Sequence, residues 1–405
     1  MRRSAPVINE CDAAPAVYAA ELLDEYRPGE SFFFSTARHT MLAQGSCAEI
    51  RCPAGLNLPD VVASALGNAL GLAGEPPVAV GAVPFDSAQQ ARLRIPAQVL
   101  RGGPLRLPLE HAPQRPVLTS YAARSVPEPA EHMRNVERAL AIMAAGEVRK
   151  IVLARTLELE SPEAVDVHQL LRNLAQRNPG SYTFAAETGG GRGQRCTMVG
   201  ASPELLVARS GTQVISNPLA GSAARSPDQA EDKRRAAALL ASAKDRREHA
   251  VVVEAVAAAL RPFCRTLDVP AEPSLISTPT MWHLSTRVTG ELLDPAISSL
   301  TLALALHPTP AVCGTPTAQA REAIRSIEPF DRGFYSGVVG WCDAEGDGEW
   351  VVTLRCAEVA ERAVRLFAGG GIVPGSRPEA ELAETSAKFR TMLQAMGLGQ
   401  EAKDL

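Results

Sequence analysis

The sequence lacks several features that would place the protein at a membrane or outside the cell. None of its 405 residues belong to an uninterrupted apolar run of about 20, the length that a membrane-spanning helix needs. The first residues, Met1 to Asp12, have no apolar core of the kind found in secretion signals. We therefore expect no membrane partner and a cytoplasmic location.

Aromatic side chains and excess charge are also scarce. Only 4% of the residues are aromatic, and the formal net charge is −4. A nucleic-acid-binding surface usually combines a basic field with side chains on which bases can stack. We therefore do not expect a nucleic acid as a partner.

The cysteines form no recognisable framework. No Cys-x-x-Cys pair occurs, so the sequence predicts neither a zinc site nor a disulfide scaffold. Scattered cysteines of this kind are typical of buried, reduced thiols in a cytosolic protein. The eight are Cys11, Cys47, Cys52, Cys196, Cys264, Cys313, Cys342 and Cys356.

What the sequence does contain is ordinary globular composition, with 46% apolar and 21% charged residues. This length is enough for one large or two medium domains. A proline-rich stretch from Gly102 to Pro129 reads as a connector between an N-terminal third and the rest, because proline removes backbone donors.

After this connector, helices and strands come in mixed order. Helices are expected over Val136–Ala145, Asp228–Leu260 and from Pro378 to about Gly397. Successive strands separated by short turns favour antiparallel pairing and an α+β fold. The expected strands are Lys150–Leu159, Ser181–Thr188, Thr197–Ala208, Thr286–Leu292, Gly333–Trp341, Trp350–Val359 and Ala363–Phe367.

Two glycine runs could bind an anionic group. Gly189 to Gly193 lacks the strand-loop-helix context and the following Lys-Ser/Thr of a phosphate-binding loop, so a hairpin turn is the better interpretation. Gly369, Gly370 and Gly371 follow an expected strand. Their backbone N–H groups could face a carboxylate, although an isolated run of this kind is more often a turn.

Two expected helices carry paired acidic residues. Asp245 and Glu248 are three residues apart, and Glu381 and Glu384 repeat this spacing, so each pair projects from one helical face. If the two faces met, their oxygen atoms would suit Mg²⁺, which binds a few carboxylates together with substrate and water. From spacing alone, solvated charged surfaces are the more common outcome.

Other candidate residues are ambiguous in isolation. Lys150 and Glu204 could simply be exposed. Arg355 lies within an apolar segment, where a buried guanidinium needs an anion that is either a structural carboxylate or a ligand. His283, between Trp282 and Leu284, could equally be a core histidine.

Taken together, these segments resemble the chorismate-utilising enzymes and, among them, the isochorismate synthases. The similar motifs occur in the family's order from about residue 130 to residue 397. They are Lys150–Arg155, Gly200–Leu206, Asn217–Ser222, Lys244–His249, Trp282–Leu284, Leu306–Ala311, Glu328–Arg332, Gly340–Asp343, Gly348–Arg355, Phe367–Pro374 and Glu381–Lys388. The N-terminal third matches only faintly.

The resemblance implies one large α+β domain over residues 1–405, with a twisted, double-layered antiparallel sheet wrapped by helices. Residues 1–128 would form its weakly matching part, and residues 129–398 the chorismate-binding part. The proline-rich connector would then not separate independent domains.

The resemblance also implies a role for each candidate. Lys150 would be the general base that activates water, and Glu204 the general acid that protonates the departing ring hydroxyl. Mg²⁺ would be the cofactor, bound by Glu248 and Glu384 with Asp245 and Glu381 nearby. Chorismate, a dianion, would be the substrate. The substrate-binding residues would be Ser222, His283, Ala311, Arg355, Gly369, Gly370, Gly371 and Lys388.

Within the family, Ala220-Gly221-Ser222 favours isochorismate synthase, because relatives that use ammonia or eliminate pyruvate usually have threonine in place of Ser222. Salicylate synthase and anthranilate synthase component I are the alternatives, and a non-catalytic chorismate-binding homologue is a fourth. The resemblance implies no obligatory amidotransferase subunit, and a monomer or weak homodimer. The product could serve siderophore, salicylate or menaquinone synthesis.

Overall fold

The structure is a computed structural model that describes residues 17–398, apart from residue 56 and segments 71–75, 108–114 and 190–194. The expectations for Met1 to Asp12, for Cys11 and for most of the Gly189–Gly193 run lie outside the described residues. The other seven cysteines are all free.

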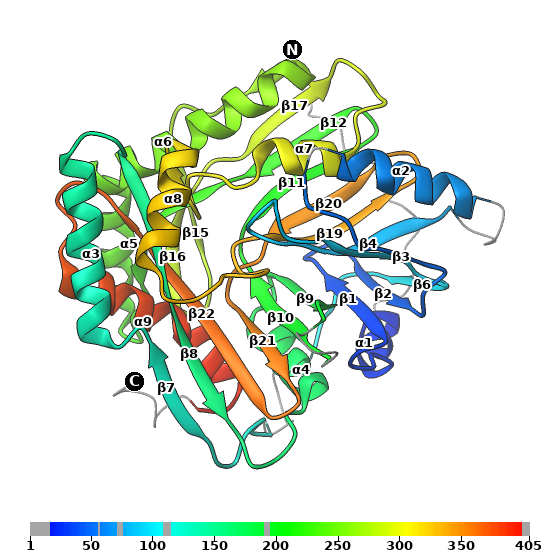
Figure 1. The fold of residues 1–405 in the computed structure, drawn as a ribbon, viewed down its shortest axis with the longest axis horizontal. Helices are drawn as coiled ribbons and strands as arrows, with labels where there is room; N and C mark the ends of the chain where they lie inside the picture. Colours follow the sequence, from blue (N-terminus) through cyan, green and yellow to red (C-terminus); the bar gives the residue numbers. More distant parts are fainter. Residues whose placement is uncertain (1–16, 56, 71–75, 108–114, 190–194, 399–405) are drawn as a thin grey trace.

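Two large antiparallel sheets dominate the fold (Figure 1). The first has ten strands in the order β18-β8-β22-β21-β10-β9-β1-β2-β6, and β7 also pairs with β8. Their bounds are β1 Ser31–Ser35, β2 Thr40–Gln44, β6 Gln98–Gly102, β7 Ala122–Val126, β8 Lys150–Glu160, β9 Tyr182–Glu187, β10 Thr197–Ser202, β18 Gly314–Thr315, β21 Cys356–Ala360 and β22 Ala363–Ile372.

The second sheet has nine strands in the order β14-β17-β12-β11-β20-β19-β4-β5-β3. These are β3 Ala48–Ile50, β4 Val78–Val83, β5 Arg92–Ile95, β11 Leu205–Ser210, β12 Gln213–Asn217, β14 Cys264–Asp268, β17 Val288–Leu292, β19 Val338–Asp343 and β20 Gly348–Val352. A small third sheet consists of β13 Leu219–Ala224, β16 Met281–Ser285 and β15 Ser274–Ser277.

Helices cover the outer faces of the two large sheets, and α5 packs on the small third sheet (Figure 1). They are α1 Val17–Asp24, α2 Leu58–Ala69, α3 Pro129–Ala144, α4 Val167–Arg177, α5 Gln229–Ala241, α6 Ala243–Leu260, α7 Ser299–Leu306, α8 Thr317–Ile327 and α9 Pro378–Ala395. None of these helices combines the length and the apolar character needed to cross a membrane.

The core is layered. Phe34 and Met198 of the ten-stranded sheet pack with Val339 and Val351 of the nine-stranded sheet, so apolar side chains fill the space between the two sheets. Separate clusters lie beneath α6 and α7 on one outer face and beneath α4 and α9 on the other. The predicted double-layered α+β fold is confirmed. Strands from both sides of the proline-rich connector occur in each of the two large sheets.

Two predicted strands are each interrupted, and the interruptions lie where the chain passes from one sheet to the other. Thr197–Ala208 divides into β10 and β11 at Pro203 and Glu204. Trp350–Val359 divides into β20 and β21 at residues 353–355, where Arg355 has a positive φ of 48°. Arg355 therefore lies in a link between two strands. Its apolar neighbours in the sequence had instead suggested a position inside a strand.

The two links are hydrogen-bonded to each other. The Val352 N–H donates to the Glu204 carbonyl at 3.1 Å, and the Ala201 N–H donates to the Arg355 carbonyl at 3.1 Å. In addition, the Ser202 hydroxyl donates to the Val352 carbonyl at 2.6 Å. These bonds fix the backbone of Glu204 and Arg355 relative to one another.

Three further predictions need correction. The expected helix Asp228–Leu260 is two helices, because Ser242 leaves the helical conformation and caps the start of α6 through the Asp245 N–H. The strand expected from Gly333 begins only at Val338, after a turn. The glycines 369–371 are not a turn, since they continue β22 and pair with β8.

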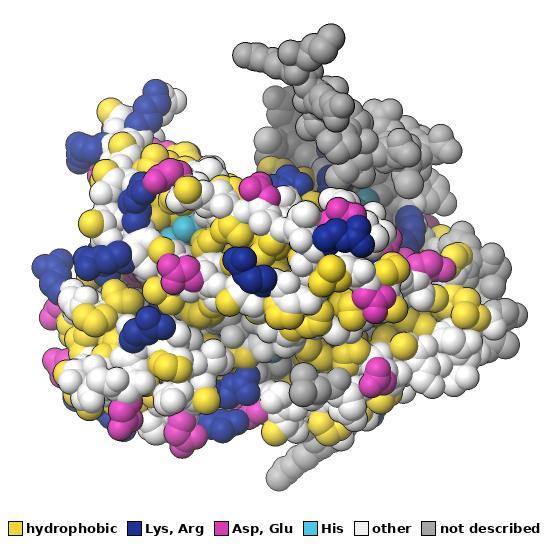
Figure 2. All heavy atoms as spheres, turned by 90° about the horizontal axis from the view of Figure 1, so that it is seen from above, with side chains coloured by type: hydrophobic (Ala, Val, Ile, Leu, Met, Phe, Trp, Pro, Cys, Tyr) yellow, Lys and Arg dark blue, Asp and Glu magenta, His cyan; other side chains and the backbone are white. Residues whose placement is uncertain are grey.

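Figure 2 shows one face of the molecule, on which Lys and Arg side chains are interspersed with Asp and Glu over the described residues. No broad area of a single charge sign is visible on that face.

Candidate active site

One cavity brings together most of the residues expected at the site. It lies where the links between the two large sheets meet β13, β22, α6 and α9. Ten of the expected residues line it: Glu204, Ser222, Glu248, His283, Ala311, Arg355, Gly369, Gly371, Glu384 and Lys388. Lys150, Gly370, Asp245 and Glu381 stand directly behind this lining.

Lys150 begins β8 and is held inward, with only 2% of its surface exposed. Its Nζ donates to Glu248 Oε1 at 2.9 Å, which links β8 to α6. A buried lysine needs a partner for its charge, and here the partner is a carboxylate that also faces the cavity. Lys150 is therefore not the exposed residue that its sequence position alone would suggest.

Glu204 is also buried, with 3% exposure. Burial raises the pKa of its carboxyl from 4.5 to about 7, although a backbone hydrogen bond and the charges of Lys150 and Arg355 oppose this rise. At neutral pH a large fraction of the Glu204 side chains therefore carry a proton. A protonated carboxyl group and a buried lysine at one site are suited to general acid–base chemistry.

Arg355 contacts His283 across the cavity, with 3.4 Å between Nη2 of the arginine and Nε2 of the histidine. Burial and the positive charge of Arg355 hold the pKa of His283 well below its usual value, so the imidazole is neutral. No carboxylate of the described residues forms an ion pair with Arg355, and its Nε has no hydrogen-bond partner there. This leaves the guanidinium available to an anionic ligand.

Ser222 and His283 lie opposite each other in the pairing of β13 with β16. The Ser222 hydroxyl donates to Glu384 Oε1 at 3.0 Å. Lys388, one turn along α9, contacts the same oxygen at 2.6 Å and donates to the Gly369 carbonyl at 2.7 Å. Burial would raise the pKa of Glu384, but Lys388 and the hydrogen bonds outweigh it and lower the pKa.

The other two acidic residues are under electrostatic strain. Burial raises the pKa of Asp245, and the charges of Glu248 and Glu384 raise it further. Burial and Glu384 act in the same direction on Glu381, whose Oε2 is buried without a hydrogen-bond partner among the described residues.

Within the described chain, no three of these side chains stand close enough to form a ready-made metal site. Glu248 and Glu384 instead contact Lys150 and Lys388. The two acidic helices do meet at the cavity, as the family resemblance implied. Their carboxylates are not the solvated surface that spacing alone makes more common, since Glu381 is only 3% exposed.

The glycines of β22 allow close approach. A Cβ on Gly371 would lie 2.5 Å from Glu248 Oε1 and 2.9 Å from Lys150 Cε, and a Cβ on Gly370 would lie 3.1 Å from Glu381 Oε2. Any side chain at Gly371 would therefore displace the Lys150–Glu248 pair. β22 pairs with β21 only as far as Leu366, so the glycines lie beyond that pairing, next to the cavity.

Sequence reasoning did not single out Tyr335, which lines the cavity beside Gly369 and stacks on Phe367 with ring centroids 4.8 Å apart. Burial raises its pKa to about 12, so the phenol stays neutral. Its only sequence signal was its place just after the Glu328–Arg332 motif. That motif forms a buried ion pair in which Arg332 also donates to the Val152 carbonyl, supporting β8.

Arg155 fixes the position of α9 relative to β8. The guanidinium donates to the hydroxyls of Thr385 at 3.0 Å and Ser386 at 2.5 Å, the two residues that follow Glu384. Arg155 is only 1% exposed, and burial lowers its pKa to about 10.

Residues 105–397 match the family of chorismate binding enzymes. This chain belongs to that family. The chain is 56% identical over 386 residues to the isochorismate synthase DhbC of Bacillus subtilis (strain 168), with 94% of this chain and 96% of the relative covered. It is 44% identical over 324 residues to the isochorismate synthase EntC of Escherichia coli (strain K12), with 80% and 82% covered.

Solved structures of chorismate binding enzymes agree with the fold. A Bacillus anthracis protein assigned as a 2,3-dihydroxybenzoate-specific isochorismate synthase, DhbC, matches with a TM-score of 0.89 and 50% identity, over 94% of this chain and all of that one. Anthranilate synthase component I from Streptococcus pneumoniae matches with a TM-score of 0.71 over 96% of this chain and all of that one, but at 22% identity it supports the fold alone.

Proposed function

We propose that this chain is an isochorismate synthase, which converts chorismate reversibly into isochorismate. The observation that carries the proposal is the presence at one site of a buried lysine, Lys150, and a buried carboxyl, Glu204, whose pKa of about 7 lets it carry a proton at neutral pH. Similarity to isochorismate synthases over nearly the whole chain supports the same reaction.

In this reaction water adds to one ring carbon, the ring double bonds shift, and a hydroxyl leaves another carbon as water. Lys150, once its ammonium group has released a proton, takes a proton from the attacking water, and Glu204 gives its proton to the departing hydroxyl. Lys150 then loses that proton to solvent and Glu204 regains one, so both groups are ready for the next turnover. Each turnover therefore consumes one water and releases one. The enolpyruvyl group takes no part.

Arg355, Lys388 and the backbone of Gly369–Gly371 bind the carboxylates of chorismate. A guanidinium recognises a carboxylate through two parallel hydrogen bonds, and Arg355 has no competing carboxylate partner among the described residues. His283 is neutral and contacts Arg355, so it orients the guanidinium without adding charge. Ser222 and Ala311 line the ring pocket.

The acidic residues fit Mg²⁺. Glu248 and Glu384 would bind the ion, while Asp245 and Glu381 would hold its water molecules. The fit rests on an all-oxygen donor set, on the pKa values of Asp245 and Glu381, which burial and then neighbouring carboxylates raise, and on the Oε2 of Glu381, which has no partner among the described residues. Bound Mg²⁺ supplies charge neutralisation and polarises the ring carboxylate of the substrate.

Two alternatives within the family differ in what they release. A salicylate synthase would eliminate pyruvate after forming isochorismate, and an anthranilate synthase component I would do so only with ammonia. A non-catalytic chorismate-binding homologue would have no need of an acid–base pair such as Glu204 and Lys150.

A pyruvate assay coupled to lactate dehydrogenase separates these reactions. The chain is incubated with chorismate and Mg²⁺, with and without ammonium, and chorismate consumption is followed in parallel. We expect chorismate to be consumed without pyruvate release. Stoichiometric pyruvate would indicate a salicylate synthase, pyruvate only with ammonium would indicate anthranilate-type chemistry, and unchanged chorismate would indicate a binding homologue.

A further inference from the structure

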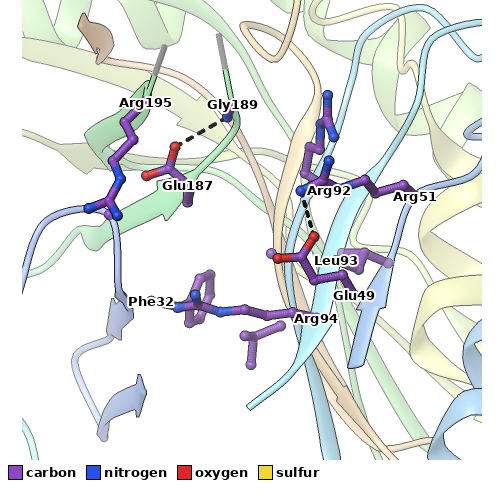
Figure 3. A pocket seen from close by; sticks show the side chains of 12 residues that line it. Phe32, Glu49, Arg51, Arg92, Leu93, Arg94, Glu187, Gly189 and Arg195 are labelled. Carbon is purple, nitrogen blue, oxygen red and sulfur yellow. Dashed lines mark hydrogen bonds and ion pairs between the residues drawn. The ribbon is translucent and has the colours of Figure 1, made fainter. Parts of the chain in front are cut away.

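A second cavity, of about 390 Å³, shares no lining residue with the candidate active site. Strands β1, β3, β4 and β5 form its walls together with the end of β9 (Figure 3). Its volume is within the range of about 300–1,000 Å³ that is usual for small-molecule sites.

The lining carries an excess of positive charge in a chain whose net charge is negative. Four arginines, Arg51, Arg92, Arg94 and Arg195, face only two carboxylates, Glu49 and Glu187. Figure 3 shows Arg195 and Glu187 on one side of the cavity and Arg51, Arg92 and Glu49 on the other. The lining therefore has two more positive than negative charges, which favours an anionic ligand.

Only one of these arginines is neutralised by a close partner. Arg51 pairs with Glu49 at 2.5 Å. Within the described part of the chain, Arg92, Arg94 and Arg195 form no ion pair. Arg94 is half-buried and donates a long hydrogen bond of 3.4 Å to the Ala43 carbonyl, and the charges of Glu187 and Glu49 act on it without forming an ion pair among the described residues. Guanidinium groups left in this state are well suited to a carboxylate.

Two further features limit which ligands suit this cavity. Phe32 contributes a buried aromatic ring to the lining, against which a flat apolar body can pack. Glu187 uses Oε1 to accept the Cys196 N–H at 3.0 Å, whereas its Oε2 is buried without a hydrogen-bond partner among the described residues. A buried carboxylate oxygen of this kind needs a donor such as a hydroxyl group.

We propose that this cavity binds a small aromatic carboxylic acid that also carries a hydroxyl group. The ligand's carboxylate pairs with Arg92 and Arg195, its ring packs on Phe32, and its hydroxyl donates to Glu187. This site is separate from the reaction proposed above, and its existence does not depend on that reaction.

Isothermal titration calorimetry with 3-hydroxybenzoate and benzoate tests the proposal. We expect 3-hydroxybenzoate to bind the full chain, and Arg92→Gln and Arg195→Gln each to weaken binding roughly tenfold or more. Benzoate should bind more weakly than 3-hydroxybenzoate, and Glu187→Gln should reduce that difference. Binding should also weaken as salt is added.

Two control variants locate the binding. Arg355→Gln removes the arginine of the candidate active site, and Arg134→Gln removes an exposed arginine of α3; neither should change the affinity for 3-hydroxybenzoate. Circular dichroism confirms that each variant is folded. Absence of binding at millimolar ligand, loss of binding in Arg355→Gln but not in Arg92→Gln, or equal affinity for the two acids would each overturn the proposal.

Discussion

At the scale of single residues, Glu204 shows how a change of sheet creates an unusual carboxyl group. The residue follows Pro203 in a link that contributes no strand pairing, so its side chain enters the space between elements and is buried there. Burial favours the uncharged acid, and the nearby Lys150 and Arg355 only partly offset this effect.

Because the pKa of Glu204 is raised in the folded chain, the free energy of unfolding should depend on pH. Folded Glu204 holds its proton up to about pH 7, whereas an unfolded glutamate releases it near 4.5. The stabilising effect of this proton is therefore complete below pH 4.5 and is lost as the pH rises through about 7. Glu204→Gln should remove this loss, gaining roughly 1–3 kcal/mol relative to the parent chain between pH 5 and pH 8.

Urea denaturation of both proteins at pH 5 and pH 8 measures this gain. An equal difference in unfolding free energy at the two pH values would show that Glu204 does not bind its proton more tightly when the chain is folded.

The role proposed for Lys150 can be tested through activity. Lys150→Ala should reduce turnover by about 10²–10⁴-fold, the usual effect of removing a general base, while the fold is retained. Lys233→Ala, an exposed lysine on α5, is the control and should keep normal turnover. Steady-state rates with chorismate and Mg²⁺ decide this, and near-normal turnover in Lys150→Ala would rule out the assigned role.

At the scale of elements, α6 and α9 bring their acidic faces to one cavity from distant parts of the sequence. Glu248→Gln and Glu384→Gln should each raise the Mg²⁺ concentration needed for half-maximal activity roughly tenfold or more, because each would remove a proposed metal ligand. Asp245→Asn should have a smaller effect, since it would contact only metal-bound water.

Exposed acids on the same helices serve as controls. Glu254→Gln on α6 and Glu379→Gln on α9 remove the same charge at the surface. If Mg²⁺ titrations of Glu384→Gln and Glu379→Gln coincide, α9 carries no metal ligand.

Much of this arrangement could be predicted from the sequence, because helical spacing places Glu381 with Glu384, and β-branched residues identify β8. The interruptions of the two predicted strands at Glu204 and Arg355 could not be predicted from the sequence. Most residues of the strands on both sides of each link are buried, so the apolar pattern continues across the break. The positive φ of Arg355 is fixed by tertiary hydrogen bonds that no local pattern reveals.

At the scale of the whole molecule, the two sheets and the helices around them enclose a site. Its residues come from parts of the sequence as far apart as positions 150 and 388. Most of these residues lie within the family motifs that the sequence contains. The same reasoning could not find Tyr335, which packs against Phe367 and Gly369 through contacts that only the folded chain creates.

In the proposed reaction the chain interconverts two isomers and releases no pyruvate. Chorismate and isochorismate differ only in hydroxyl and double-bond positions, so their free energies should be close and the reaction should stop at a mixture. Chromatography of the products, starting separately from chorismate and from purified isochorismate with Mg²⁺, is the most direct test. The account predicts the same final ratio of the two isomers from both directions, with the enolpyruvyl group intact. Complete conversion to an aromatic product, or no reaction from isochorismate, would contradict it.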